Sequence, residues 1–517
     1  MQWTKLVLPS AVFTCILLVS TLAQAQYSSN VEGFVLDPSG AAVPDAPVTL
    51  RNLDTGVENT TRTSASGNYR FNSVQPGNYL VAAEAGGFKK TEVNFALSTG
   101  QTQGIDIHMA VAATSTQVTV TSEAAALDVD ENRIQETLSA TAVRDLPQLN
   151  RNLWDVLAVT PGVVGTGTRG SGESPGGGAD NFGTQTPQIS ANGRSYTGNL
   201  VMVDGMNVTS PVQNGNIILA PVPDAIQEAS LQTNSWNAEN NLGSSVLIQI
   251  TTKSGTNQFH GSGSLFFTNQ DLQAKQEFVT GNFTPFARKD LEGTFGGPIV
   301  KNKTFFFADF EKLWATTPTA VGGVVSWEAP QFVQWANSNF PGTVGTQALN
   351  LYPPVFDRAN GNIETAQTYF AAQSLACGTA ATANIPCSLP VLAFGNFSAS
   401  PYYNALQYNF RLDQYFTEKD RLYLSYYNDS FDQQQIAPRN GLEALDIMRN
   451  RYGQADFTHT FGASMLWESS FAFASVGGAN GQDANLQVPE ITVNDGTQGF
   501  HIGGGWGPGE YRGPMYN

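Results

Sequence analysis

From about residue 255 to its end, the chain is dominated by segments in which apolar and polar residues alternate. In 453–461, one alternate set is Ala455, Phe457, His459 and Phe461, and the other is Gln454, Asp456, Thr458 and Thr460. Successive side chains of a strand point to opposite faces, so this pattern predicts strands with one apolar and one polar face. A soluble β-sandwich shows the same alternation. Segments of about ten residues, however, suit a tilted membrane crossing with apolar residues outward better than a typical soluble strand.

Two further segments repeat the pattern. In one, Met465, Trp467, Phe471 and Phe473 share a face; in the other, Tyr408, Phe410 and Leu412 oppose Asn409, Arg411 and Asp413. The block F-G-G-P-I-V-K-N-K-T-F-F-F-A-D-F-E at 295–311 resembles a barrel hairpin of Oar-like outer-membrane receptors, which implies that Lys301-Asn302-Lys303 forms a short turn on the periplasmic side. The region 313–400 is then expected to be a long, outward-facing loop region. Short turns on one side and long loops on the other are typical of membrane barrels.

The amino terminus predicts export. Lys5 precedes an apolar run at 6–19, and Ala23-Gln24-Ala25 supplies small residues for cleavage after Ala25. The run is shorter than the roughly 20 residues of a membrane-spanning helix. The balance of 43 acidic against 26 basic residues, a net charge of −17, argues against a nucleic-acid partner. A mature chain of this kind is either a β-barrel or a soluble exported protein.

Cys377 and Cys387 remain after cleavage, ten residues apart in a small, polar, loop-like segment. An oxidising compartment favours a disulfide between them that pins the loop. A metal site is the alternative, but no neighbouring His or Cys pair completes a tetrahedral ligand set. We therefore expect a disulfide.

A small β-sandwich is predicted at 26–110. Short β-rich runs at 31–36, 47–52, 67–72, 79–83 and 105–109 are separated by turn-forming residues, with Tyr69, Phe71, Tyr79 and Val81 as core. Gly67 and Gly77 are placed where turns need a positive φ. The motifs V-x-G-x-V-x-D-P-S-G, S-x-S-G-N-Y-R-F and P-G-N-Y-L-V resemble a carboxypeptidase regulatory-like domain, which implies a carbohydrate-binding-like fold. We expect a structural or docking role first and glycan binding second.

The stretch 190–210, S-A-N-G-R-S-Y-T-G-N-L-V-M-V-D-G-M-N-V-T-S, combines a short apolar strand with Asp204-Gly205, a pair suited to a tight turn. It resembles the plug domain of TonB-dependent outer-membrane receptors. Asn192, Gly193 and Arg194 belong to the same motif. The block L-N-R-N-L-W-D-V-L-A-V-T-P-G-V and the block at 234–252 resemble other plug segments of the Oar-like branch. We expect Asn192, Arg194 and the Asp204-Gly205 pair to hold the turn geometry or to contact charges on a barrel wall.

One helix is predicted from periodicity, at 145–162. Its apolar residues recur every three or four positions, and the periodic residues are Leu146, Leu149, Leu153, Val156 and Leu157. Asn150 could cap this helix, and Thr160-Pro161-Gly162 is expected to stop it.

Between the sandwich and the plug, the linker 111–123 carries the extended patch Gln117, Val118, Thr119, Val120 and Thr121. This patch resembles a TonB box, which must be extended and able to add a strand to a partner's sheet edge. The last strand of the sandwich and the first strand of the plug are equally good interpretations.

The expected fold class is mainly β: a signal peptide at 1–25, the sandwich, the linker, an α/β plug at 124–254, and the first part of a transmembrane antiparallel barrel at 255–517. Family barrels close with about 22 strands and this one has about eight, so the sequence is expected to be an amino-terminal fragment.

The resemblance implies uptake of a bulky or scarce solute, a carbohydrate or a peptide, across the outer membrane of a Gram-negative bacterium. It implies a TonB-type energy-transducing partner, contact with outer-membrane lipid and a periplasmic amino-terminal domain. An exported β-rich adhesin or glycan-binding surface protein is the alternative. The four histidines are scattered without catalytic context, so we expect no enzyme, cofactor or metal site.

Overall fold

The computed structural model describes the following residues: 29–111, 118–119, 135–146, 153–158, 160–167, 188–209, 217–233, 245–272, 287–316, 319–320, 325–354, 358–396, 398–399, 401–435, 444–463, 465–482, 491–493, 500–502 and 509–516. The expected signal segment with Ala25 lies outside these residues, as do Asn150, Gln117, Val120 and Thr121. Within the described ranges, no helix has both the length and the apolar character that a membrane crossing requires.

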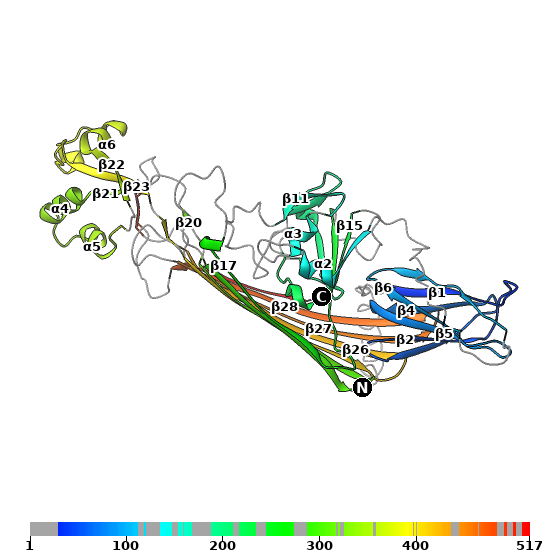
Figure 1. Ribbon diagram of the computed structural model, residues 1–517. Helices are drawn as coiled ribbons and strands as arrows, with labels where there is room; N and C mark the ends of the chain where they lie inside the picture. The colour runs from blue at the N-terminus through cyan, green and yellow to red at the C-terminus, as the bar shows by residue number, and fades with distance from the viewer. Residues whose placement is uncertain are drawn as a thin grey trace, which may run out of the picture.

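The described units lie along one long, curved sheet (Figure 1). An N-terminal domain, 29–111, lies at one end of this sheet, and a loop unit, 325–396, lies at the other. A central α/β unit, 135–252, lies against the sheet between them. We call the long sheet the wall sheet.

The N-terminal domain is built from two small sheets. One has the order β4-β1-β7, with β8 also paired to β1, and the other has the order β3-β2-β5-β6-β9. The strands are β1 (Ser29–Leu36), β2 (Pro47–Asn52), β3 (Glu58–Arg62), β4 (Asn68–Val74), β5 (Gly77–Ala83), β6 (Thr91–Leu97), β7 (Thr102–Gly104), β8 (Ile107–His108) and β9 (Val118–Thr119).

The core of this domain comes from alternate residues of both sheets, as the sequence predicts. Tyr69 and Phe71 of β4 and Tyr79 and Val81 of β5 are all buried. Gly67 has a φ of 78° in the turn before β4 and Gly77 a φ of 156°.

The strand expected at 105–109 is wrong in extent. Only Ile107 and His108 form a strand there, although the amides of Ile105 and Met109 also bond to carbonyls of β1. The Ile105 carbonyl accepts the Tyr69 hydroxyl at 2.7 Å, and the Asp106 carboxylate accepts the Phe34 amide at 2.9 Å.

The central unit has a five-stranded sheet in the order β10-β15-β16-β13-β14 and a separate β11-β12 pair. Its apolar core includes Trp154, Val201, Ile226 and Ile248, all buried. The elements are β10 (Gln135–Ser139), α2 (Ala140–Asp145), α3 (Leu153–Leu157), β11 (Val163–Gly167), β12 (Gln188–Ala191), η3 (Tyr196–Gly198), β13 (Leu200–Val203), β14 (Met206–Asn207), η4 (Pro223–Ala225), β15 (Ile226–Gln232) and β16 (Leu247–Thr252).

The predicted helix 145–162 is only partly correct. Leu153, Val156 and Leu157 are buried on α3, but α2 ends at Asp145. Leu146 is extended, with a ψ of 135°, and 44% exposed. Pro147 follows Leu146, and a residue before proline is disfavoured in the helical region. The three- and four-residue spacing of apolar residues therefore continues in the sequence past Pro147, although the helix ends before it.

The wall sheet has eight antiparallel strands in the order β17-β18-β19-β25-β26-β27-β28-β31. They are β17 (His260–Asn269), β18 (Ala287–Val300), β19 (Thr304–Thr316), β25 (Tyr402–Tyr415), β26 (Asp420–Gln435), β27 (Ala444–Gly462), β28 (Met465–Gln482) and β31 (Gly509–Tyr516). A short 3₁₀ turn, η6 (Gln270–Leu272), follows β17, and β29 (Ile491–Val493) pairs with β30 (Phe500–Ile502).

The two faces of the wall sheet are chemically different, as the alternation predicts. On β25, Phe410 is 58% exposed while its neighbours Asn409 and Arg411 are buried. On β27, Asp456 is buried and Phe461 is exposed. The polar face is the one that meets the central unit. The turn Lys301-Asn302-Lys303 also forms as predicted, with a φ of 60° at Asn302 and Val300 paired with Thr304.

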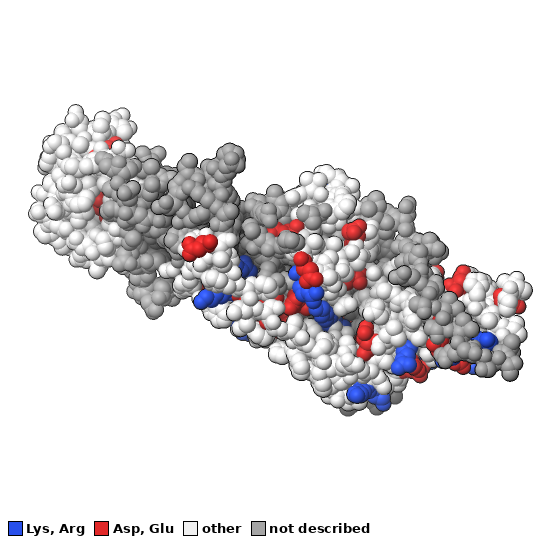
Figure 2. All heavy atoms as spheres, viewed as in Figure 1, with Lys and Arg blue, Asp and Glu red and all other residues white. Residues whose placement is uncertain are grey.

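The region 313–400, expected to be a loop region, contains helices and strands of its own. The chain therefore has more helices than the one that its periodicity predicts. Its helices carry apolar runs too short to give a clear period. The face in Figure 2 shows few charged side chains over this loop unit. Between the wall strands lie β20 (Thr319–Ala320), β21 (Val325–Glu328), α4 (Pro330–Asn339), α5 (Val344–Leu351), β22 (Arg358–Thr365), α6 (Ala366–Ala372), η7 (Ala380–Thr382), β23 (Pro390–Asn396) and β24 (Ser398–Ala399).

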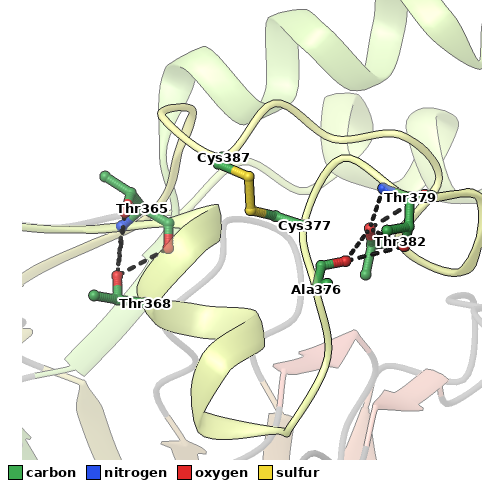
Figure 3. The surroundings of a disulfide bond; sticks show 7 residues. All are labelled: Thr365, Thr368, Ala376, Cys377, Thr379, Thr382 and Cys387. Atoms are coloured by element: carbon green, nitrogen blue, oxygen red, sulfur yellow. Dashed lines mark hydrogen bonds between the residues drawn. A yellow bond between two sulfur atoms is a disulfide. The ribbon is translucent and has the colours of Figure 1, made fainter.

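Cys377 and Cys387 are joined by a disulfide in this unit (Figure 3). It closes the segment between α6 and β23. A capping box of Thr365 and Thr368 starts α6, and Gln367 on its first turn donates its amide to the Cys387 carbonyl at 3.0 Å. The disulfide therefore fixes the loop against the helix that precedes it.

Replacing Cys387 by Ser is expected to destabilise the loop unit by about 2–3 kcal/mol, because a ten-residue loop is no longer closed in the unfolded chain. Hydrogen exchange of α6 and β23 measures the change, and wild type reduced with dithiothreitol should match the variant. Unchanged exchange in both would show that the bond does not stabilise the unit.

Candidate functional site

The site begins with a two-residue turn in the central unit. Asp204 and Gly205 join β13 to β14 with φ angles of 47° and 86°, and Val203 pairs with Met206 across them. Two consecutive positive φ angles define a hairpin turn that favours Asp-Gly. The predicted turn chemistry is therefore present, and it presents the Asp204 side chain beyond the sheet.

The Asp204 carboxylate links the central sheet to the wall sheet. From β16 it accepts the Thr252 amide at 2.9 Å and the Thr252 hydroxyl at 2.6 Å. From β26 it accepts the hydroxyls of Tyr423 at 2.8 Å and Tyr427 at 3.2 Å. A single buried carboxylate thus serves donors from two different sheets.

Arg411 of β25 completes the network with a positive charge. Its Nη1 lies 3.6 Å from the Asp204 carboxylate and donates to the Thr252 carbonyl at 2.9 Å. Two more of its nitrogens bind Asp413 at 2.8 and 3.1 Å, and its guanidinium lies 4.7 Å from the Tyr423 ring centroid. Since Asp204 and Arg411 are each 6% exposed, these charges are stable only while paired.

The remaining contacts between the central unit and the wall sheet are also partly polar. Gln454 donates to the Asp204 carbonyl at 2.9 Å, and Asn450 donates to the Ile218 carbonyl at 3.0 Å. Tyr427 and Tyr452 pack their rings into the apolar core of the central unit. The network positions and neutralises charge between the central unit and the wall sheet.

The other predicted motif residues lie apart from this network. Asn192 has a φ of 55° and donates its side-chain amide to the Thr233 carbonyl at 2.7 Å, and Gly193 continues the turn with a φ of 69°. Arg194 is exposed, and its backbone amide binds the Ala191 carbonyl at 3.1 Å. These residues shape a turn of the central unit, whereas Asp204 contacts wall charge.

The described part of the candidate TonB box, Val118 and Thr119, lies in the N-terminal domain. Val118 and Thr119 form β9, which pairs in parallel with Thr91 and Glu92 of β6. They therefore extend the edge of a sheet in the N-terminal domain. This position agrees with the interpretation as a last strand of the sandwich, and it shows that the segment can add to a sheet edge.

The N-terminal domain contacts both the central unit and the wall sheet near the Asp204 site. The Thr99 amide donates to Glu228 of β15 at 2.8 Å, and the Thr99 hydroxyl lies 2.9 Å from that of Thr251 on β16. Gln75 contacts the wall sheet at Asp413, 3.3 Å away. A cavity of about 350 Å³ lies where the three units meet, lined by residues that include Gln75, Lys253, His260 and Arg421.

The sequence does not single out four residues that belong to the Asp204 network: Thr252, Arg411, Tyr423 and Tyr427. Arg411 was placed on the polar face of its strand, but nothing near it in sequence names its partner. The order of strands in the wall sheet was the missing information.

A long antiparallel sheet, apolar outside and polar toward an internal α/β unit, defines a membrane β-barrel wall with a domain held against its inner face. Residues 251–514 match the family described as "Outer membrane beta barrel domain", and residues 30–110 match the "Carboxypeptidase regulatory-like domain". The chain belongs to this outer-membrane β-barrel family.

A curated relative, the TonB-dependent transporter Oar of Myxococcus xanthus, is 28% identical over 308 residues, which are 57% of this chain and 27% of the relative. This confirms the resemblance drawn from the motifs. The chain thus spans about a quarter of that relative's length.

Two solved structures are similar to this chain. The outer membrane transporter YddB from Escherichia coli is 10% identical with a TM-score of 0.44, over 68% of this chain and 40% of that one. A mutant ferric enterobactin receptor from Pseudomonas aeruginosa is 15% identical with a TM-score of 0.39, over 74% and 45%.

Replacing Asp204 by Ala is expected to destabilise the contact between the central unit and the wall by about 3 kcal/mol, because it leaves buried donors and part of the Arg411 charge unpaired. Urea unfolding in detergent measures the loss. Asp271→Ala, at an exposed position of η6, is the matched control. Equal midpoints for the two variants would contradict a stabilising role of the network.

Glu228 gives a pH dependence. Burial raises its pKa from 4.5 to about 7, against the lowering effect of the Thr99 amide. The folded protein therefore binds this proton more tightly than the unfolded chain, so stability falls as pH rises from about 4.5 to about 7 and is level above.

The variant Glu228→Gln is expected to lose this slope while keeping an acceptor for Thr99. Unfolding midpoints at about pH 5 and about pH 8 test it, with exposed Glu136→Gln as the control. An unchanged slope in Glu228→Gln would show that another group titrates.

Proposed function

We propose that the chain acts in energy-coupled uptake across the outer membrane of a Gram-negative bacterium, with residues 124–254 as a plug that a TonB-type protein remodels. The observation that carries this proposal is the buried Asp204 network between the central unit and the wall. The N-terminal domain lies in the periplasm in this scheme, and the apolar outer face contacts lipid.

A polar contact suits a plug that must move. A hydrogen bond exchanged for one with water changes stability by only about 0.5–1.5 kcal/mol, so donors and acceptors that water reaches as the plug moves can separate and pair again. Arg411 keeps Asp413 as a partner when Asp204 leaves. One of the two carboxylate partners of Arg411 therefore remains when the plug moves.

The topology gives a route for force. Among the described residues of the central unit, β10 comes first in the chain, and it is an edge strand of its sheet. β10 pairs antiparallel with β15 from Gln135–Gln232 to Ser139–Glu228. A pull that reaches Gln135 and acts across the strand loads these pairs one after another instead of all together, so the edge strand is then the first part to open.

The curated relative supports transport and no enzyme activity, since it is described as a TonB-dependent transporter. The solute is then a bulky or scarce molecule, a carbohydrate or a peptide. An exported adhesin or glycan-binding surface protein remains the second candidate, and it requires no energy coupling.

Replacing Val118 by Pro is expected to abolish binding of the purified periplasmic domain of a TonB protein, because proline lacks the backbone donor that strand addition uses. Binding is measured by calorimetry, and uptake of labelled oligosaccharides and peptides is compared in cells with and without TonB. Ser115→Pro, in the same linker, is the control.

The two interpretations of this patch give different results. A TonB box loses partner binding in Val118→Pro while the N-terminal domain keeps its melting temperature. A last strand of the sandwich loses melting temperature and leaves partner binding intact. Solute uptake that does not depend on TonB would favour the adhesin alternative over the transporter.

A further inference from the structure

Three carboxylates gather on the inner face of the wall sheet, away from the Asp204 site. Asp290 and Glu292 project from β18, and Glu311 projects from β19 directly opposite Glu292 in the ladder. All three are at most 1% exposed. One oxygen from each lies within 4.8 Å of the others.

Two carboxylate oxygens of this group lack a hydrogen-bond partner in the described part of the chain. Arg288 pairs with Oδ2 of Asp290 at 3.1 Å, and Gln407 donates to Oε2 of Glu311 at 2.5 Å. Oδ1 of Asp290 and Oε1 of Glu311 are buried and have no hydrogen-bond partner in the described part of the chain. Buried carboxylate oxygens without a partner are costly.

The register adds to this cost. Like charges directly opposite each other on neighbouring strands destabilise a sheet, and Glu292 and Glu311 form such a pair. A divalent cation between them turns the repulsion into a bridge and supplies a partner for the free oxygens.

The set of ligands favours calcium. Calcium takes about six to eight oxygen ligands in a flexible geometry, whereas magnesium demands a near-ideal octahedron, keeps several waters and is usually held by one or two carboxylates. We propose that Asp290, Glu292 and Glu311 bind a calcium ion that joins β18 to β19 on the inner wall.

The sequence did not indicate this site, and no metal was expected from it. Asp290 and Glu292 occupy alternate positions of a strand, as any polar inner face does, and Glu311 lies on the next strand. Only the register of the β18–β19 hairpin brings the three together. The site needs neither an energy source nor a solute and is independent of the proposed transport.

The test uses the full chain in detergent after treatment with EDTA. Added calcium chloride is expected to raise the melting temperature of the wild type by several degrees, and equilibrium dialysis is expected to count one more bound calcium in it than in Glu311→Gln. The affinity of that variant should fall by about tenfold or more. Glu418→Gln, in the exposed turn between β25 and β26, should keep the wild-type response.

Each other result overturns the proposal. A wild type that binds no calcium in dialysis rejects the site, and a melting temperature that responds to pH but not to calcium indicates a shared proton between Glu292 and Glu311. Equal losses in Glu311→Gln and Glu418→Gln indicate surface binding. If Glu311→Gln does not fold, the test uses Asp290→Asn instead, which should bind one calcium fewer than the wild type.

Discussion

The Asp204 carboxylate is the point where the central sheet and the wall share one hydrogen-bond network. A carboxylate can accept several donors, and here they come from Thr252 on one side and from Tyr423 and Tyr427 on the other. Its position follows from a turn that only a few residue types form easily. The polar inner face of the wall is satisfied at this place by a charge from the internal unit, and the network depends on that single residue.

The features that the sequence predicted are local. The Asp-Gly turn, the alternation of β25 and β27, and the core of the N-terminal domain each depend on neighbouring residues, so one segment was enough to predict them. The helix at 145–162 shows the limit of that method, because its apolar period ran through the position before Pro147. Short capped helices in the loop unit lacked a period long enough to be recognised.

The partners of Asp204 could not be predicted, for a different reason. Arg411, Tyr423 and Gln454 lie more than 200 residues along the chain from it, as in the Asp204–Gln454 separation of 250 residues. The alternation of apolar and polar residues predicts that each of these side chains lies on the inner face of the wall sheet. It does not predict which residue of the central unit each one contacts. That depends on strand order and on how the central unit sits against the wall, and neither is encoded in a local pattern.

The N-terminal domain and the Asp204 network are connected through two consecutive residues of β16. Thr251 meets the hydroxyl of Thr99, and Thr252 binds Asp204. Neighbouring side chains of a strand point to opposite faces, so β16 places the N-terminal domain on one face and the wall network on the other. Any displacement of β16 large enough to release Asp204 must also change the contact with Thr99. In the proposed transport cycle, the N-terminal domain is therefore mechanically coupled to the plug.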